Sequence, residues 1–122
     1  MTVREAIDRV RRMKPCDFKD ETLVEFLNDV EKDIQVKVYK LPLDKLTGYC
    51  LPQDDNTTLL VPPPFDKVYK LYMAAQIDLY RGEYTNYMNT SEAYNKAVGD
   101  FHAYYMREIY KPKGGCLNGT GT

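Results

Sequence analysis

Residues 65–110 decide the fold, and they read FDKVYKLYMAAQIDLYRGEYTNYMNTSEAYNKAVGDFHAYYMREIY. Nine of the eleven tyrosines fall in this stretch. Apolar residues recur through it at helical spacing, which predicts two helices. Gly82 is a natural stop for the first helix. Asn89-Thr90-Ser91-Glu92 has the spacing of a capping box and can start the second, while residues 83–88 fit either a separate turn or one continuous helix.

The first of these helices is apolar around most of its circumference. One stripe contains Phe65, Val68, Tyr69, Tyr72, Ala75 and Leu79, and further apolar residues fall outside it, namely Leu71, Met73, Ile77 and Tyr80. A helix of this kind is buried on more than one side. A chain of 122 residues offers few neighbours to cover it, so we expect a second copy or another protein to cover part of it.

The N-terminal residues predict an amphipathic helix pair. Thr2 is a candidate N-cap, with Glu5 at capping-box spacing, and Pro15 ends the first helix. The second helix starts at Asp20 or Thr22. Its predicted buried face consists of Leu23, Phe26, Leu27, Val30 and Ile34, and its predicted solvated face consists of Glu25, Asp29, Glu31 and Asp33.

The middle of the chain changes character. Residues 48–51 and 57–61 have strand-like composition, and Gln53-Asp54-Asp55-Asn56 between them is a good turn. A short β-hairpin is one interpretation, and an extended surface loop over the helix pair is the other. The predicted fold is therefore mainly α, a four-helix bundle with a hairpin or extended loop between the second and third helices. Residues 1–112 form a single helical domain, and 113–122 are a Gly-rich tail.

Composition narrows the class of protein. The 17 basic and 18 acidic residues nearly cancel, so net charge makes no case for nucleic-acid binding. Three widely spaced cysteines, Cys16, Cys50 and Cys116, fit neither a disulfide framework nor a zinc site, and a reducing compartment is expected. Charged residues interrupt the N-terminus, so we expect no signal peptide, and no run approaches the about 20 apolar residues of a membrane helix.

A search for catalytic chemistry finds little. His102 is the only histidine, and its helical neighbours are mainly aromatic. The glycines form no nucleotide-binding fingerprint, and Asp54-Asp55-Asn56 lacks the further oxygen ligands of a calcium loop. We therefore expect no catalytic residue, metal or cofactor, and no enzyme.

The first helix carries a basic group of residues, Arg4, Arg9, Arg11, Arg12 and Lys14, diluted by Glu5 and Asp8. Arg4 and Arg11 are seven residues apart and share a helix face. Three interpretations stay open: a solvated face, a salt-bridge surface against protein, and a DNA contact.

The tyrosines are a more specific signal. A tyrosine joins a large apolar body to a polar tip, so it suits a surface that is wet before assembly and buried after it. We expect Tyr72 and Tyr94 to pack in a helix pair within one chain, with their hydroxyls reaching solvent. Tyr87, Tyr104 and Tyr105 cannot all face one partner helix, so they are candidates for contacts between subunits.

The segment 59–69, LLVPPPFDKVY, resembles a known family, together with residues 75–84, AQIDLYRGEY, and an aromatic helix before Lys111-Pro112-Lys113-Gly114. The family is that of the head-tail connector proteins, also called adaptor or neck proteins, of tailed bacteriophages and prophages. The resemblance covers most of the chain and is strongest over residues 59–114.

The resemblance implies a mostly helical structural protein of the virion neck, made in the bacterial cytoplasm. Similar connectors form rings, commonly twelve-fold, between the portal and the tail proteins, and DNA passes through the lumen without specific binding. On this basis we expect the mid-chain segment, with Leu59 and Leu60, to project to the neighbouring protein layer on one side of the ring. We expect the tail, with Lys113 and Leu117, to extend to another layer and to become ordered when it docks there. The alternative is a small helical regulatory or DNA-binding protein of a phage or prophage.

Overall fold

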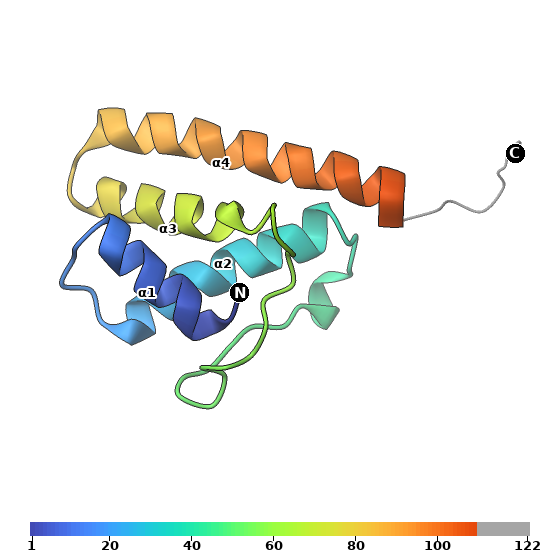
Figure 1. Ribbon diagram of the computed structural model, residues 1–122, viewed down its shortest axis with the longest axis horizontal. Coiled ribbons are helices and arrows are strands. Elements are labelled where there is room, and N and C mark those ends of the chain that lie inside the picture. The colour runs from blue at the N-terminus through green and yellow to red at the C-terminus, as the bar shows by residue number, and fades with distance from the viewer. Residues whose placement is uncertain (110–122) are drawn as a thin grey trace, which may run out of the picture.

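The computed structural model describes residues 1–109 of the chain. Four helices make up the fold: α1 (Val3–Met13), α2 (Asp20–Lys37), α3 (Lys67–Tyr80) and α4 (Tyr84–Tyr104). A 3₁₀ turn lies at Leu43–Lys45, and α4 passes into a single π-helical turn at Tyr105–Ile109. Figure 1 shows α3 and α4 side by side, with α1 and α2 on the other side of α3. The predicted mainly helical, four-helix fold is confirmed.

The boundaries of α1 follow from local chemistry and match the prediction. The Thr2 hydroxyl accepts a hydrogen bond from the Glu5 backbone N–H at 3.2 Å, and the Glu5 carboxylate accepts one from the Thr2 N–H at 2.8 Å. This capping box satisfies two backbone donors that the first turn leaves without helical partners. The helix ends at Met13, just before Pro15.

The central helix of the fold is α3, which packs against α1, α2 and α4. Met73 and Ile77 are fully buried beside Val68 and Tyr69, although the predicted stripe left Met73 and Ile77 out. The reason is that three helices of the same chain surround α3. The apolar circumference of α3 is thus largely covered within one copy, more than the sequence indicated.

The turn between α3 and α4 is tighter than predicted. Gly82 has a φ of 75°, a left-handed conformation that terminates α3, so the predicted stop is confirmed. The next helix, however, starts at Tyr84 and not at Asn89. The Glu83 carbonyl accepts the Tyr87 N–H at 2.9 Å, which begins the α-helical ladder at once. Residues 83–88 therefore belong to the turn and the first part of α4.

The predicted β-hairpin is wrong for the described chain, and residues 46–62, here called the strap, form a loop instead. The backbone of residues 57–59 pairs with the N-terminus, because the Val3 N–H donates to the Thr57 carbonyl at 3.0 Å and the Leu59 N–H to the Met1 carbonyl at 2.9 Å. Within the described residues, this pairing amounts to one isolated bridge between Thr2 and Thr58. The other predicted strand, residues 48–51, is hydrogen-bonded to α2 instead.

That other segment binds to side chains of α2. The Asn28 amide donates to the Tyr49 carbonyl at 3.0 Å and accepts the Tyr49 N–H at 2.8 Å. The Gln35 amide repeats the pattern with the carbonyl and N–H of Thr47, at 3.1 and 3.0 Å. Two side-chain amides thus replace the partner strand, and the strap lies along α2 without a second strand.

Glu31 lies between those two amides on α2 and corrects another prediction. We expected it on the solvated face, but it is fully buried. Its carboxylate accepts hydrogen bonds from the Tyr49 hydroxyl at 2.5 Å, the Tyr69 hydroxyl at 2.7 Å and the Leu60 N–H at 3.0 Å. A buried carboxylate is tolerated when donors surround it. Glu31 therefore fixes the strap to α2 and α3.

A second buried carboxylate joins α1 to α3. Asp78 is fully buried, and one of its oxygens accepts from the Lys14 ammonium at 2.7 Å. Its other oxygen has no hydrogen-bond partner among the described residues. Arg81 adds a hydrogen bond to the Pro15 carbonyl, so the end of α1 is attached to the end of α3 at two points.

Candidate interaction surface

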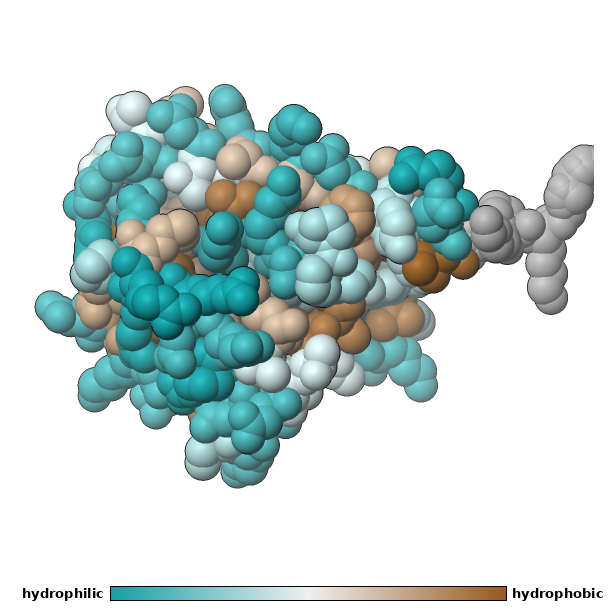
Figure 2. All heavy atoms as spheres, viewed as in Figure 1, coloured by the Kyte–Doolittle hydropathy of each residue, from teal (hydrophilic) through white to brown (hydrophobic). Residues whose placement is uncertain are grey.

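An apolar groove lies between the ends of α2 and α4. Two adjoining hollows, of about 340 and 560 Å³, share Tyr39, Leu60 and Tyr105 as lining residues. The groove is further lined by Pro62, Phe101, Tyr104, Ile109, Gln35, Leu41, Lys45 and Thr47. In the view of Figure 2, hydrophobic residues gather toward the end where α4 finishes.

Aromatic rings hold the groove in shape. Tyr39 and Tyr105 meet edge to face with centroids 4.9 Å apart, and Phe65 and Tyr104 lie 4.9 Å apart. Phe101 is buried beneath them and contacts all four rings. Such ring pairs stabilise beyond the area that they bury. One wall of the groove is therefore formed by the end of α4, by the π-helical turn after it and by Tyr39, two residues after α2.

The opposite wall is Leu60 of the strap. Its neighbours Leu59 and Val61 point into the core, which leaves the Leu60 side chain outward and 43% exposed. The Leu60 N–H is fixed by Glu31, and the Val61 N–H donates to the Tyr69 hydroxyl at 2.8 Å. Two backbone donors in succession are thus held by buried groups, so Leu60 is positioned before any partner arrives.

The surroundings of Glu31 keep Tyr69 and Tyr49 in the neutral form. Burial, followed by the charge of Glu31, raises the pKa of the Tyr69 hydroxyl far above its ordinary value. Burial and the hydrogen bond to Glu31 do the same to the pKa of Tyr49. Both hydroxyls therefore stay protonated and donate hydrogen bonds to the Glu31 carboxylate over the whole physiological pH range.

The structure brings three of the seven predicted interface residues together and leaves the others apart. Leu60, Tyr104 and Tyr105 come together in the groove, although 44 residues or more separate the first from the others in the chain. Leu59 is buried in the core and is not part of an exposed surface. Tyr87 is half-buried near the other end of α4. Lys113 and Leu117 lie outside the described residues.

The predicted packing of Tyr72 and Tyr94 within one chain is confirmed, but the hydroxyl of Tyr94 binds Asp33 and does not simply reach solvent. Their rings meet with centroids 5.2 Å apart, between α3 and α4. Tyr94 is buried, and its hydroxyl donates to Asp33 of α2 at 2.8 Å. These two tyrosines belong to the interior of one copy.

Three further apolar side chains are exposed near the α3–α4 turn. Tyr80 packs against Phe18 and Phe26 yet stays 65% exposed. Tyr84, the first residue of α4, is 64% exposed, and Met88, one helical turn later, is 61% exposed.

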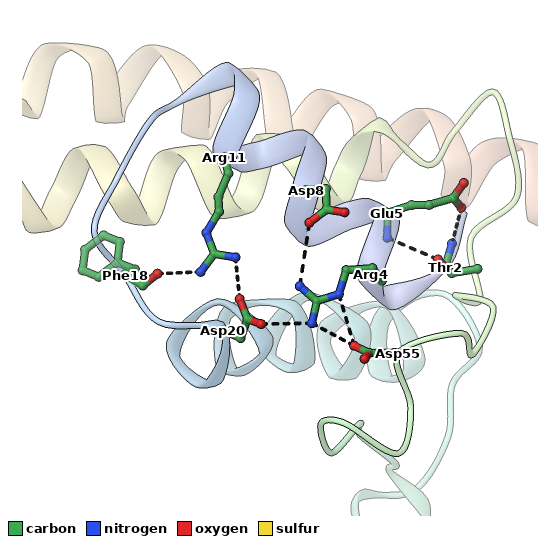
Figure 3. A network of polar contacts seen from close by, with 8 residues as sticks. All are labelled: Thr2, Arg4, Glu5, Asp8, Arg11, Phe18, Asp20 and Asp55. Atoms are coloured by element: carbon green, nitrogen blue, oxygen red, sulfur yellow. Dashed lines mark hydrogen bonds and ion pairs between the residues drawn. The ribbon is translucent and has the colours of Figure 1, made fainter.

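Part of the basic face of α1 is a salt-bridge network within the chain. Figure 3 shows the Arg4 guanidinium between three carboxylates: it binds Asp20 and Asp55, each at 2.9 Å, and Asp8 lies 3.7 Å away. Arg11 binds the same Asp20 and donates to the Phe18 carbonyl at 2.7 Å. The two guanidinium groups hold the pKa of Asp20 below its usual value. Arg4 and Arg11 are thus occupied, while Arg9 and Arg12 remain exposed.

Sequence reasoning missed several residues of the groove, above all Tyr39, Phe101 and Ile109. A signal for two of them was present, because Phe101, Tyr105 and Ile109 recur at intervals of four residues and so share one helical face. Tyr39 had no such signal, since only the folded chain brings the end of α2 beside the end of α4.

Two further findings bear on the class of protein. Within residues 1–109, no helix combines the length and apolarity needed to span a bilayer, and no cluster of three or more histidine, cysteine or acidic side chains has the arrangement of a metal site. Comparisons of the chain with protein-family models, curated proteins and solved structures find no match.

Proposed function

We propose that this chain is a structural subunit of the neck of a tailed bacteriophage or prophage. In this proposal it is a head-tail connector that forms a ring between the portal and the tail proteins, and it carries out no catalysis. In this proposal the ring is twelve-fold, which is the common symmetry of similar connectors. The subunits are made in the bacterial cytoplasm, and DNA passes through the lumen of the ring without specific contacts.

One observation carries the proposal: residues that the sequence marks as interface candidates, Leu60, Tyr104 and Tyr105, meet in one open apolar groove. The rest of the helical unit already has a closed core of its own. An exposed apolar surface on a self-sufficient subunit is typical of a protein that binds other proteins. The resemblance of residues 59–114 to phage connectors names the kind of assembly.

The DNA-binding alternative loses support at α1. A recognition helix needs unpaired basic side chains directed at the phosphates or bases. Arg4 and Arg11, which share one face of α1, are bound to Asp20 and other carboxylates of the same chain. The face that Arg4 and Arg11 share is therefore used in folding, only Arg9 and Arg12 of the basic group remain exposed, and we retain the connector as the proposed function.

The test uses the phage or prophage that encodes the chain. Deletion of its gene is expected to give heads and tails that do not join, and the purified protein is expected to co-sediment with purified portal rings. The chain should be present in purified virions. Normal tailed particles without the gene, or a protein that ignores the portal, would contradict the proposal.

The predicted tail contact has its own test. A chain truncated after Pro112 keeps every described residue but lacks Lys113 and Leu117. We expect it to bind the portal but to fail in joining heads to tails. Full complementation by the truncated chain would show that the docking role of the tail is wrong and would leave the connector proposal in place.

A further inference from the structure

The described part of the chain ends at the edge of the groove. Ile109 is the last described residue, and it lines the groove beside Tyr105. Residues 110–122 follow it in the sequence, and Leu117 stands eight positions after Ile109. Eight residues of extended chain span about 26 Å. Hollows of about 340 and 560 Å³ are much shorter than this span, so the tail is long enough to cover the groove of its own chain.

The tail and the groove also match in polarity. Residues 114–122, GGCLNGTGT, contain no charged side chain, and Cys116 and Leu117 form an apolar pair near their centre. The groove is lined by apolar and aromatic side chains, two uncharged polar ones and a single charged one, Lys45. An uncharged segment with an apolar centre can therefore enter this groove without the cost of burying an unpaired charge.

The sequence between Ile109 and this segment favours a reversal of the chain. Lys111-Pro112-Lys113-Gly114 has proline at its second position and glycine at its fourth, which is the pattern of a type I turn. A reversal is needed here, because a segment that departs from one edge of the groove must turn back in order to fill it.

We propose that the tail folds back onto the groove of its own chain and places Leu117 in the hollow between Tyr39, Leu60 and Tyr105. One leucine makes a weak anchor, but the tether holds it near the groove at an effective concentration in the millimolar range. Such a contact covers the apolar surface of the free subunit and still gives way to a stronger partner. It goes beyond the proposed function and does not depend on it.

In a connector, this contact would link two binding events. The tail leaves the groove when it docks on a neighbouring layer, and the groove is then free for a second protein. Binding of the tail by one partner therefore raises the affinity of the groove for another, by the factor that the tail's own occupancy had removed. This consequence, unlike the contact itself, rests on the proposed function.

The natural Cys116, next to Leu117, serves as a proximity probe in a chain whose other two cysteines are replaced by alanine. Leu60→Cys and Leu41→Cys each place a thiol in a wall of the groove. Ala103→Cys is the matched control, because it is exposed on α4, does not line the groove and is closer to Cys116 along the chain. Circular dichroism verifies folding, and the rate of intramolecular disulfide formation is measured in dilute solution.

Both groove variants are expected to form the disulfide about tenfold faster than Ala103→Cys, because the bound tail holds Cys116 beside the groove. Adding Leu117→Ser to each chain should bring the rates to about the same value, since an unbound tail reaches the control position at least as readily. The rates should not change with protein concentration, because the contact lies within one chain.

Three results would overturn the proposal. The first is equal rates at the groove and control positions, and the second is a preference for the groove that survives Leu117→Ser. The third is a disulfide between chains whose rate rises with concentration, which would assign the groove to a second copy. The experiment needs neither portal nor phage, so its failure leaves the connector function standing, and failure of the connector tests leaves the contact standing.

Discussion

Tyr69 connects three parts of the structure, namely α3, α2 and the strap. It is fully buried in α3, its hydroxyl donates to Glu31 of α2, and the same oxygen accepts the Val61 N–H of the strap. One phenol thus satisfies a buried acceptor and a buried donor. Because the strap carries Leu60, Tyr69 also determines the position of one wall of the groove.

This role gives a first prediction about stability. Tyr69→Phe removes the hydroxyl and leaves both the Glu31 carboxylate and the Val61 N–H short of a partner, so unfolding free energy should fall by about 1–3 kcal/mol. Tyr39→Phe is the control, because its hydroxyl lies 3.4 Å from the Leu60 carbonyl and is exposed. Its cost should stay within about 0.5 kcal/mol. Urea denaturation measures the unfolding free energy of both variants. Equal losses of stability would contradict the role given to the Tyr69 hydroxyl.

At the scale of single residues, sequence reasoning succeeded where the cause is local. Thr2 and Glu5 form the predicted capping box because three residues separate them along the chain. Glu31 was assigned to the solvated face of α2 because its partners, Tyr49, Leu60 and Tyr69, are 18 to 38 residues away. No pattern within a helix indicates that a carboxylate will meet distant donors.

At the scale of elements, two glycines show how backbone conformation decides the effect of a methyl group. Gly82 terminates α3 with a φ of 75°, a conformation that an L side chain adopts at a cost. Gly99 lies inside α4 in ordinary helical conformation. A Cβ added at either position meets no atom within 4 Å. Space is therefore equal at the two sites, and only the dihedral angle differs.

The second prediction follows from this pair. Gly82→Ala should destabilise the protein by about 1 kcal/mol, because alanine is strained at positive φ. Gly99→Ala should stabilise it by up to about 1 kcal/mol, because alanine loses less backbone entropy in a helix. Thermal unfolding of both variants measures the difference. Shifts of the same sign in the two variants would argue against the turn geometry.

The mid-chain segment shows the limit of predicting elements from sequence. Residues 48–51 and 57–61 have the composition of strands, but their hydrogen bonds go to Asn28 and to the N-terminus. Composition indicates how readily a segment becomes extended, not which backbone it will pair with. The sequence left the start of α4 open, and the structure has it at Tyr84, two residues after the left-handed Gly82.

For the molecule as a whole, buried tyrosines link stability to pH. Burial is the first cause that raises the pKa of Tyr49, Tyr69 and Tyr94, and neighbouring Glu31 or Asp33 adds to it. The folded state therefore holds these three protons more tightly than the unfolded state does. Their contribution is complete below the ordinary tyrosine pKa of about 10 and is lost as pH rises through the folded values.

The third prediction is an alkaline unfolding transition coupled to ionisation. Above about pH 10, tyrosinate absorbance from the three buried phenols should rise together with the loss of helical circular dichroism. Tyr94→Phe removes one of the three and should reduce the absorbance change of this cooperative step. Ionisation of every tyrosine while the helices remain intact would contradict the burial described here.

The candidate surface was predicted in part at this same scale. The excess of tyrosine in residues 65–110 indicated an interface, and Tyr104 and Tyr105 do line an exposed apolar groove together with Leu60. Most of the apolar circumference of α3 has instead an internal explanation, since α1, α2 and α4 cover it. The sequence shows how much apolar surface must be hidden, but the division between interior and exterior depends on tertiary packing.

The strap is attached to the helices by side chains and not by a partner strand, and this has a consequence for its local dynamics. The backbone N–H groups of Thr47, Tyr49, Leu60 and Val61 all donate to side chains of α2 and α3. These four bonds can break when the strap separates from α2 and α3 while the helical hydrogen bonds stay intact. Hydrogen exchange of the four amides is therefore expected to report the opening of the strap, at a free energy below that of global unfolding.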